Sequence, residues 1–441
     1  MRALVIGGGV VGVTTAYYLA RDGLEVTLVE KEDELATLAS AGNAGLIAPG
    51  HSFAWASPAA PMELLRSLTV EDTALRVNPL KAPQMFFWGL RFLRECRAER
   101  AVKNTLIKLR LAQYSQRKLD ELTATEKIDY HDIHRGCLYI YRDRAKFEAG
   151  VRKMKLLLDH DQKQDVLDVD GVLEAEPALA PGRDIIVGAI YGGTDASGDS
   201  VKLTRDLAER CRQMGVTIES GNGARRFVVD GGRVRSAVTD RGEMEADLFV
   251  LAAGVQSTAI AKTAGVRIPV APAKGYSATF PLKDAGAEAP TLGGVDEELL
   301  VAWCRMGDRL RLTGSAEFTG YEKTYKDRDF RGIMRLARDL FPNAADYENG
   351  SYRACNRPMT PDGPPILGKG RYTNLYLNTG HGHMGFTMAC GSSKIVSDLI
   401  ARRKPDIPVE GMTLESRPSE TNIADPDVDW PPPAVDQNMA P

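Results

Sequence analysis

Three glycines near the N-terminus have the spacing that lets a backbone approach a phosphate group. Residues 3–30 read ALVIGGGVVGVTTAYYLARDGLEVTLVE, in which an apolar run enters the turn Gly7-x-Gly9-x-x-Gly12. Such glycines allow a tight turn, a close approach to a pyrophosphate and the packing of a helix on a sheet. Glu30 ends the second apolar run, where a carboxylate accepts hydrogen bonds from a ribose hydroxyl. The pattern predicts dinucleotide binding; the alternative is a purely structural glycine turn.

A strand, a helix and a second strand must position these residues. Residues 3–6 and 25–30 are the expected strands, and 10–20 the expected helix, whose first N–H groups face the phosphates. Residues 248–254, LFVLAAG, predict a buried parallel strand that runs into a tight turn. The predicted fold class is therefore α/β, with a Rossmann-like doubly wound domain assembled from separated segments.

The rest of the chain predicts a second, α+β domain with a mainly antiparallel sheet. Other expected elements are helices over 84–125 (two), 145–180, 203–213, 330–341 and within 374–403, a strand pair in 128–142, a hairpin over 226–239, and strands at 216–219, 275–280, 299–305 and 309–314. We assign 1–80, 200–263 and 356–417 to the nucleotide-binding domain, 81–199 and 264–355 to a substrate domain, and 418–441 to a Pro-rich tail.

Composition excludes several classes of function. The 441 residues carry 56 basic and 59 acidic side chains, a net charge of −3. The chain therefore has no overall basic excess that would attract a nucleic-acid backbone. The six cysteines lie far apart without a CxxC pair, which argues against a zinc site and against a disulfide framework. We find no signal peptide and no membrane-spanning run, so we expect a cytoplasmic protein, or one bound peripherally to the inner face of the membrane.

Residues 85–93, MFFWGLRFL, leave two alternatives open for that last point. The segment is amphipathic if helical, and Arg94, Arg97 and Arg100 follow it. Such a helix can lie on a membrane surface. The alternative is a helix that buries its aromatic face in the core.

Five motifs carry a resemblance that covers nearly the whole chain. They are VIGGGVVGV (5–13), AGNAG (41–45), KGYS (274–277), RPMTPDG (357–363), and NTGHG with TMACG between 378 and 391. With them the sequence resembles the FAD-dependent oxidases and dehydrogenases of the D-amino acid oxidase and glycine oxidase group, and within it the bacterial D-amino acid dehydrogenase family of small-subunit type.

The resemblance implies FAD rather than NAD as the cofactor. The residues it assigns to FAD are Gly7, Gly9, Gly12, Glu30, Lys31, Ser40, Asn43, Ala44, Gly45, Ala224, Ala253, Gly254, Gly380, His381, Met384, Gly385, Phe386 and Thr387. The stretch from Gly380 to Gly385 precedes a helix of small residues, whose N-terminus stabilises negative charge on the reduced flavin ring. For residues 43–45 the alternative is an ordinary turn.

We expect three catalytic residues, of which the resemblance implies the first two. Arg357 binds the substrate carboxylate, which a planar guanidinium does with two hydrogen bonds; the alternative is a structural ion pair. Tyr276 and Lys274 belong to the KGYS motif, which in relatives stands at the start of the substrate domain beside the flavin. The alternative is a strand whose side chains only pack in the core. His383 departs from the family pattern, and it tunes the flavin, faces the substrate, or is an ordinary packing or exposed histidine.

Four further side chains are weaker candidates. Tyr139, His51 and Trp55 are candidates for the wall of the pocket. Cys355 stands five residues before Thr360-Pro361-Asp362, the position at which a cysteine carries the flavin covalently in monomeric sarcosine oxidase and its relatives. The alternative for Cys355 is a small buried thiol and non-covalent FAD.

The expected reaction is oxidative deamination of D-amino acids to 2-oxo acids and ammonia. A hydride passes from Cα to flavin N5, and a quinone-type acceptor takes the electrons. The imine hydrolyses in water, so we assign neither a general base nor a metal. Alternatives are a D-hydroxyproline or other imino-acid dehydrogenase, a sarcosine or glycine oxidase-like enzyme, and a catalytically silent flavoprotein subunit. An NAD-linked enzyme is disfavoured, since the distal motifs would then have no role. The oligomeric state is left open.

Overall fold

The glycine turn follows an interior strand of a six-stranded sheet in the computed structural model, which describes residues 1–67, 75–77 and 85–417. Neighbouring strands in this sheet run parallel, except that β19 and β20 are antiparallel. In spatial order the strands are β19 (Ile366–Lys369), β20 (Leu375–Thr379), β13 (Leu248–Leu251), β1 (Arg2–Ile6), β2 (Glu25–Val29) and β9 (Thr217–Glu219).

Both faces of this sheet are covered, which explains why β1 and β13 are continuously apolar. Ala3 and Val5 pack in one core cluster, and Leu4 and Ile6 pack in another on the opposite face. The first face meets α1 (Val10–Arg21), α4 (Ala98–Glu126), α7 (Ser200–Gln213) and α10 (Gly385–Ile400). The second meets α8 (Ser257–Thr263) and the small antiparallel sheet of β10 (Ala224–Asp230), β11 (Arg233–Thr239) and β12 (Gly242–Glu245).

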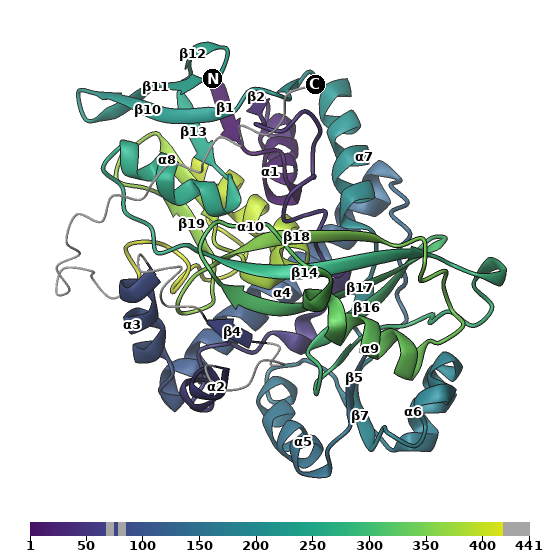
Figure 1. Ribbon diagram of the computed structural model, residues 1–441. Helices are drawn as coiled ribbons and strands as arrows, with labels where there is room; N and C mark the ends of the chain where they lie inside the picture. The colour runs from purple at the N-terminus through teal and green to yellow at the C-terminus, as the bar shows by residue number, and fades with distance from the viewer. Residues whose placement is uncertain (68–74, 78–84, 418–441) are drawn as a thin grey trace.

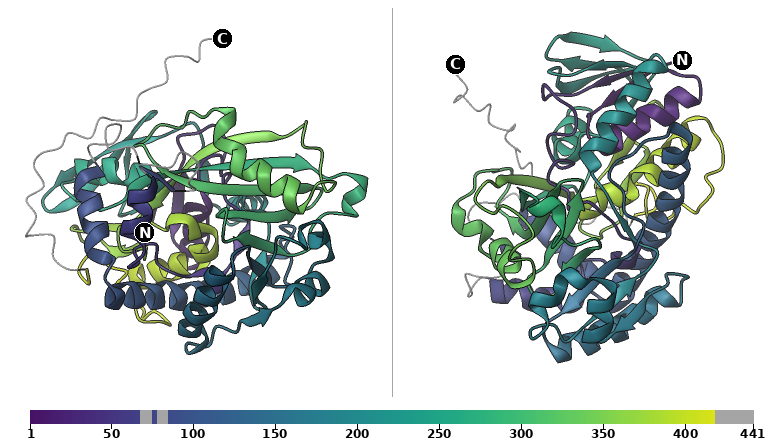
Figure 2. Two further views of the ribbon diagram at one scale, coloured as in Figure 1. Left: turned by 60° about the horizontal axis from the view of Figure 1, so that its bottom comes forward. Right: turned by 90° about the vertical axis from the view of Figure 1, so that its right-hand side faces the viewer.

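A larger, mainly antiparallel sheet lies below the first in Figure 1. Its strand order is β18 (Ser351–Met359), β14 (Ala271–Pro281), β17 (Arg309–Phe318), β16 (Val301–Met306), β15 (Gly293–Asp296), β5 (Cys137–Tyr141), β7 (Gly188–Gly192) and β6 (Asp165–Leu167), with β4 (Leu75–Val77) paired to β17. One face packs on α9 (Arg331–Leu340) and α6 (Val169–Ala175). The side view in Figure 2 shows the two sheets as separate layers of the molecule.

The remaining elements border the space between these layers. They are β3 (Leu46–Ile47) paired with β8 (Ala196–Ser197), α2 (Ala60–Ser67), α3 (Phe86–Glu95) and α5 (Arg144–Leu158). None of the described helices is long and apolar enough to cross a bilayer.

Most of the predicted elements are confirmed, and so is the α/β fold class. The β1–α1–β2 unit, helices α3, α4, α7 and α9, the β10–β11 hairpin, strand β13 and the β20–α10 unit all lie where they were expected. The predicted domain ranges stay a prediction, and residues 418–441 lie outside the described part of the chain.

Three expectations about secondary structure are wrong or incomplete. The strand pair in 128–142 is the single strand β5, whose partners β7 and β15 come from distant segments. The helical segment 145–180 is α5 and α6, separated by β6. Strand β18 was not predicted, although it carries Arg357. It also runs across the boundary between residues 355 and 356 at which we expected the substrate domain to end.

Helix α10 packs tightly against α4 at Gly391. A Cβ atom on Gly391 would lie 2.7 Å from the Cβ and 2.8 Å from the Cα of Ser115. The backbone N–H of Gly391 also donates to the Ser115 hydroxyl, at 2.9 Å. The helix that begins at the cavity is therefore held by a contact that has no room for a methyl group.

We predict that Gly391→Ala lowers the free energy of unfolding by about 1–3 kcal/mol, because the two helices must separate. The control is Gly332→Ala in α9, where an added Cβ meets nothing within 4 Å; there the better helix propensity of alanine should leave stability equal or slightly raised. Midpoints of urea unfolding followed by circular dichroism test this. Equal midpoints for the two variants would contradict the packing argument.

Candidate functional site

A cavity of about 2600 Å³ lies between the two sheets and opens to solvent. Pockets for single small ligands are typically about 300–1,000 Å³. The cavity is lined at one end by the glycine turn and at the other by inner strands of the large sheet. The edge strand β18 of that sheet and the start of α10 line its middle. It is therefore large enough for a dinucleotide and a second, smaller molecule.

The glycine turn has the geometry that only glycines allow. Gly7 has a φ of +115°, and a Cβ there would lie 2.5 Å from the Ala252 carbonyl oxygen. A Cβ on Gly12 would lie 1.8 Å from the Gly7 oxygen, so Gly12 serves the packing of α1 and does not line the cavity. A Cβ on Gly9 would have one neighbour, the Ser40 hydroxyl at 3.2 Å. The backbone at Gly9 thus leaves room for a pyrophosphate to approach.

Polar groups surround this end of the cavity. Ser40 accepts a hydrogen bond from the Val10 N–H at the start of α1, at 3.0 Å. The buried Glu30 carboxylate accepts from the N–H groups of Gly8, at 2.5 Å, and of Glu32, at 3.0 Å. Each carboxylate oxygen has further lone pairs, so Glu30 can also accept from a ribose hydroxyl. Other expected cofactor residues that line this end are Lys31, Ala224, Ala253 and Gly254.

Side chains of the large sheet hold the loop that follows, residues 36–45. Arg353 donates to the Thr37 oxygen at 2.6 Å, and the Cys355 thiol to the Leu38 oxygen at 3.2 Å. Arg311 donates to the carbonyl oxygens of Ala41, at 2.7 Å, and Asn43, at 2.9 Å. Burial lowers the pKa of Arg311. Sequence reasoning missed this arginine, because Arg309-Leu310-Arg311-Leu312 has the alternation of a strand with one face in water.

The loop residues themselves divide into two sets. Asn43 and Ala44 line the cavity, and the Asn43 side chain accepts from the Gly45 N–H at 2.7 Å. Gly45 has a φ of +82° and sits behind the wall, since a Cβ there would lie 2.8 Å from the Cys304 sulfur. Gly45 therefore shapes the loop and does not face the cavity.

The start of α10 reaches the middle of the cavity. Gly380 and Gly382 have φ values of +81° and +60°, and the chain then enters α10 at Gly385. The lining residues here are Gly380, His381, Gly382, His383, Met384, Gly385, Phe386 and Thr387. The first turn of α10 holds no acidic residue, so its partial positive charge is left for a ligand. Burial lowers the pKa of His381 to about 3, so this histidine is neutral where it contacts the Ser392 hydroxyl, at 2.9 Å.

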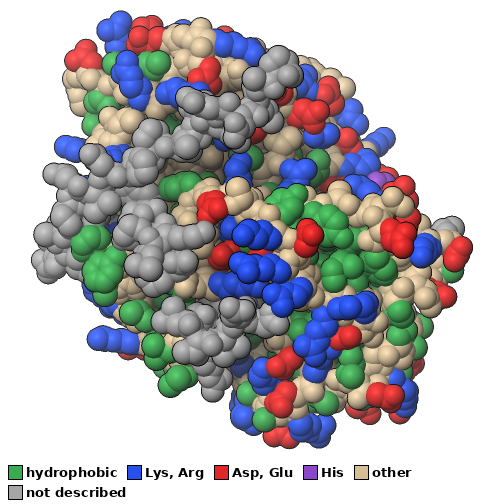
Figure 3. Space-filling view, viewed as in Figure 1, with side chains coloured by type: hydrophobic (Ala, Val, Ile, Leu, Met, Phe, Trp, Pro, Cys, Tyr) green, Lys and Arg blue, Asp and Glu red, His purple; other side chains and the backbone are tan. Residues whose placement is uncertain are grey.

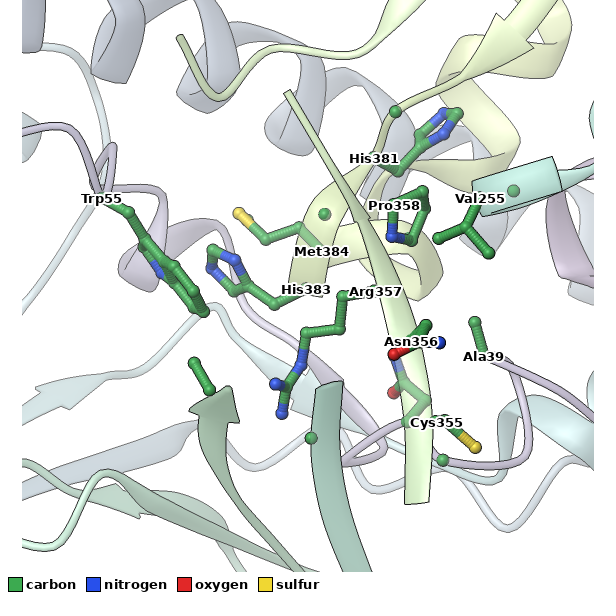
Figure 4. Close-up of a pocket in the computed structure, with 18 of the residues that line it drawn as sticks. Ala39, Trp55, Val255, Cys355, Asn356, Arg357, Pro358, His381, His383 and Met384 are labelled. Carbon is green, nitrogen blue, oxygen red and sulfur yellow. The ribbon is translucent and has the colours of Figure 1, made fainter. Parts of the chain in front are cut away.

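Arg357 extends from β18 into the same space (Figure 4). Its guanidinium lies over Gly275 of β14, where a Cβ would come within 2.3 Å of the Arg357 Cζ. Nη1 donates to the Ser315 carbonyl oxygen at 2.7 Å. Among the described residues no carboxylate lies within ion-pair distance of this guanidinium. Burial lowers the pKa of Arg357 to about 10, so it is charged at neutral pH.

The structure corrects the role expected for Tyr276. Adjacent residues of a strand point to opposite faces, and with Gly275 toward the cavity Tyr276 points into the core. The Tyr276 side chain is 1% exposed, packs on the Phe330 ring and donates its hydroxyl proton to Glu317. Lys274 pairs with the same carboxylate at 3.1 Å. Neither side chain lines the cavity, so a catalytic role for Tyr276 has no geometric basis.

The weaker candidates do line the cavity, at its far end. The rings of His51 and Tyr139 stack with centroids 5.0 Å apart, and His51 Nε2 lies 2.8 Å from the Glu297 carboxylate. The Trp55 ring stacks on His383, with centroids 4.9 Å apart. Burial alone would raise the pKa of Glu297, but His51 and Lys153 bring it below its usual value.

Two lysines at this end were not predicted. Lys108 of α4 is buried and donates to the Phe53 oxygen at 2.8 Å, and burial lowers its pKa to about 7. Lys153 of α5 lies 4.0 Å from the centre of the Phe53 ring. A signal for Lys108 exists in the sequence, because it shares the helical stripe of the buried residues Leu111, Ser115 and Leu119.

Cys355 lines the cavity beside the 36–45 loop. Burial raises the pKa of its thiol, which favours the neutral buried form over a nucleophilic thiolate. Covalent attachment of FAD to Cys355 stays a hypothesis.

Comparisons with known proteins agree with this geometry. A profile of the FAD dependent oxidoreductase family matches residues 2–399. The chain is 41% identical to D-amino acid dehydrogenase 2 of Mesorhizobium japonicum over 93% of this chain and 99% of that protein, and 36% identical to D-amino acid dehydrogenase of Bradyrhizobium diazoefficiens over 94% and 98%. Glycine oxidase from Geobacillus kaustophilus has the same fold, with a TM-score of 0.74 at 18% identity over 95% of this chain and 99% of that one.

We predict that Arg311→Met weakens FAD binding about 10- to 100-fold, because it leaves the buried carbonyls of residues 41 and 43 without a donor. Arg309→Met is the control: Arg309 is half-exposed and pairs with Asp199 at 2.8 Å. Titration of the apoprotein with FAD, followed by quenching of flavin fluorescence, gives both affinities. Equal affinities of the two variants for FAD would show that the contacts of Arg311 with the 36–45 loop do not support FAD binding.

Proposed function

Because the chain belongs to the family of FAD dependent oxidoreductases, we propose that it oxidises D-amino acids to 2-oxo acids and ammonia. The relatives named D-amino acid dehydrogenase support this substrate class. The single observation that carries the proposal is Arg357, a charged guanidinium that faces the cavity and has a lone carbonyl acceptor, that of Ser315, among the described residues.

The surroundings of Arg357 favour a carboxylate ligand. A guanidinium presents its N–H groups in a planar fork that matches the two oxygens of a carboxylate. The Ser315 carbonyl and the bare backbone of Gly275 fix the plane of this fork. Since no carboxylate of the described chain occupies the fork, an α-carboxylate of a substrate completes the pair.

The rest of the cavity fits FAD at the opposite end. When bound, FAD accepts the two electrons of the substrate Cα–H bond as a hydride, while the nitrogen lone pair forms the C=N bond. The residues proposed to hold FAD are those of the glycine turn, Glu30, the 36–45 loop and the start of α10. The N-terminus of α10 is positioned to stabilise negative charge. The imine hydrolyses in water, so the proposal assigns no residue as a base for that step.

We predict that D-amino acids bleach the oxidised flavin band of the holoenzyme under nitrogen. Arg357→Lys should raise the apparent KM about 100-fold, because a point charge replaces a two-bond fork. Tyr276→Phe is the control, expected within about twofold of the wild type, since this hydroxyl faces the core. Stopped-flow spectroscopy with D- and L-amino acids, D-hydroxyproline and sarcosine gives the rates.

The same experiment separates the other functions. Faster bleaching by secondary amines would favour an imino-acid dehydrogenase or a sarcosine oxidase-like enzyme. A flavin that no amino acid reduces would contradict the proposal and favour a silent subunit. Reoxidation by a quinone but not by air would identify a dehydrogenase.

We propose further that the electrons pass to a quinone at a membrane surface, which α2 and α3 contact. Phe86, Leu90 and Leu93 follow helical spacing on α3 and are 62%, 40% and 46% exposed, and Met62 and Leu65 of α2 are exposed as well. Figure 3 shows apolar side chains on the left-hand edge of the molecule, where α3 lies in Figure 1. The opposite side of α3 packs inward through Trp88 and Phe92. The core alternative for residues 85–93 thus describes the side of α3 that carries Trp88 and Phe92, and we propose the membrane alternative for the exposed side.

Two features support contact of this apolar surface with a membrane instead of with water. The exposed side chains of α3 border the mouth of the cavity, where a lipid-soluble acceptor would approach. Arg94 and Arg97 are exposed next to them and complement anionic headgroups.

We predict that the double variant Leu90→Gln/Leu93→Gln binds vesicles of phosphatidylglycerol and phosphatidylethanolamine at least about tenfold more weakly than the wild type. The matched control is Leu158→Gln/Met214→Gln, which removes two side chains that are each 40% exposed elsewhere. Co-sedimentation with the vesicles measures the partition. Loss of binding in both double variants, or in neither, would contradict a specific role of α3.

A further inference from the structure

The His383 imidazole is a polar group of the cavity whose hydrogen bonding is unmet. Both ring nitrogens, Nδ1 and Nε2, are buried and have no hydrogen-bond partner among the described residues. A buried polar group without a partner is unfavourable, and in native structures such a group is usually explained by a ligand, a water or a catalytic role. His383 lines the cavity, so the missing partner is a molecule that enters it.

The ring is held rigidly. It stacks on Trp55 with an angle of 18° between the two planes. The chain just before Trp55 is fixed to α4, because the Ala54 N–H donates to Thr105 at 3.0 Å and Lys108 donates to the Phe53 oxygen. The imidazole therefore presents its nitrogens in a preset direction, as a binding group should.

The ring is also neutral. Burial, and then Lys108, His51 and Arg357, lower the pKa of His383 well below its usual value. A neutral imidazole has one nitrogen that donates and one that accepts. The cavity thus holds a fixed acceptor nitrogen beside the proposed carboxylate site.

Arg357 and His383 are neighbours by topology as well as in Figure 4. A β-bridge joins Met359 of β18 to His381, and the two side chains come from two residues before and two residues after this bridge. In an amino acid the amino group is one carbon away from the carboxylate. A carboxylate on Arg357 therefore brings the amino group within the neighbourhood of the His383 ring.

We propose that the neutral imidazole of His383 accepts a hydrogen bond from the amino group of the substrate whose carboxylate lies on Arg357. This inference rests on the proposed function and adds the group that recognises the amine. As the Cα–H bond breaks and the C=N bond forms, positive charge develops on the nitrogen, and the N–H···N bond becomes stronger. His383 then stabilises the transition state more than the bound substrate.

Two ligands separate binding of the amine from the chemistry. 2-Aminoisobutyrate has no α-hydrogen and cannot be oxidised, and isobutyrate differs from it by lacking the amino group. We expect His383→Phe, which keeps the stack on Trp55 but has no ring nitrogen, to weaken 2-aminoisobutyrate about 10- to 100-fold and isobutyrate by no more than about twofold. Calorimetry on the holoenzyme measures both constants.

Three comparisons complete the test. His383→Gln, which restores an acceptor, should recover part of the affinity, and Arg357→Met should weaken both ligands. The rate of flavin reduction by a D-amino acid should fall in His383→Phe by more than the loss in 2-aminoisobutyrate affinity, because the hydrogen bond strengthens in the transition state.

The results that would contradict the role of His383 differ from those that would contradict the proposed oxidation of D-amino acids. Equal losses for both ligands, no loss for either, or no measurable binding of 2-aminoisobutyrate to the wild type would overturn the inference. A shift of the flavin midpoint potential in ligand-free His383→Phe, with the amine preference intact, would instead assign the ring to the cofactor. A wild type that prefers 2-aminoisobutyrate through His383 but is reduced by no amino acid would sink the proposed reaction and leave the amine site standing.

Discussion

The candidate site depends on one row of side chains from the large sheet, two of which hold the loop of residues 36–45. On β18, Arg353 and Cys355 contact the carbonyl oxygens of Thr37 and Leu38. Alternate residues of a strand share a face, so the next in the row is Arg357. The first two positions fix the loop of the six-stranded sheet, and the third is left for a ligand. The strand β18 therefore carries both the residues that hold the 36–45 loop and the arginine for which we propose a carboxylate ligand.

The buried cations divide according to what they contact. Arg311 donates to Thr279, Ala41 and Asn43, so its hydrogen-bonding capacity is largely used within the protein. Arg357 has one carbonyl acceptor among the described residues, and its guanidinium lies against the bare backbone of Gly275. A buried charge without a counter-ion is unfavourable, and it is tolerated best where a ligand completes it. This difference separates Arg311, whose contacts lie within the protein, from Arg357, for which we propose a ligand, although both belong to the same sheet.

Local patterns predicted the parts of the fold that depend on local physics. The strand–glycine–helix unit at residues 2–21 follows from apolar runs and glycine spacing, which are features of neighbouring residues in the sequence. Strand β18 was missed because Ser351-Tyr352-Arg353 is polar and its partner β14 lies about eighty residues earlier. Tyr276 was misplaced because a motif does not say which face of a strand each residue occupies. Gly275, its neighbour, is the residue of that motif on which the site depends.

The charged residues of the site show the same limit in a different form. Arg311 alternates with leucines as an exposed residue would, yet its face of the strand is covered by a loop that lies 270 residues earlier in the chain. Lys108 could be recognised, since a lysine within a buried helical stripe is an anomaly in a single sequence. The reason is physical. A charged residue within an apolar stripe of one helix stands out in the sequence, whereas an arginine that faces water and one that donates to a distant carbonyl have the same sequence pattern. The proposal that Arg357 binds a ligand therefore rests on the partners that this arginine lacks among the described residues, and that information exists only once the sheets are assembled.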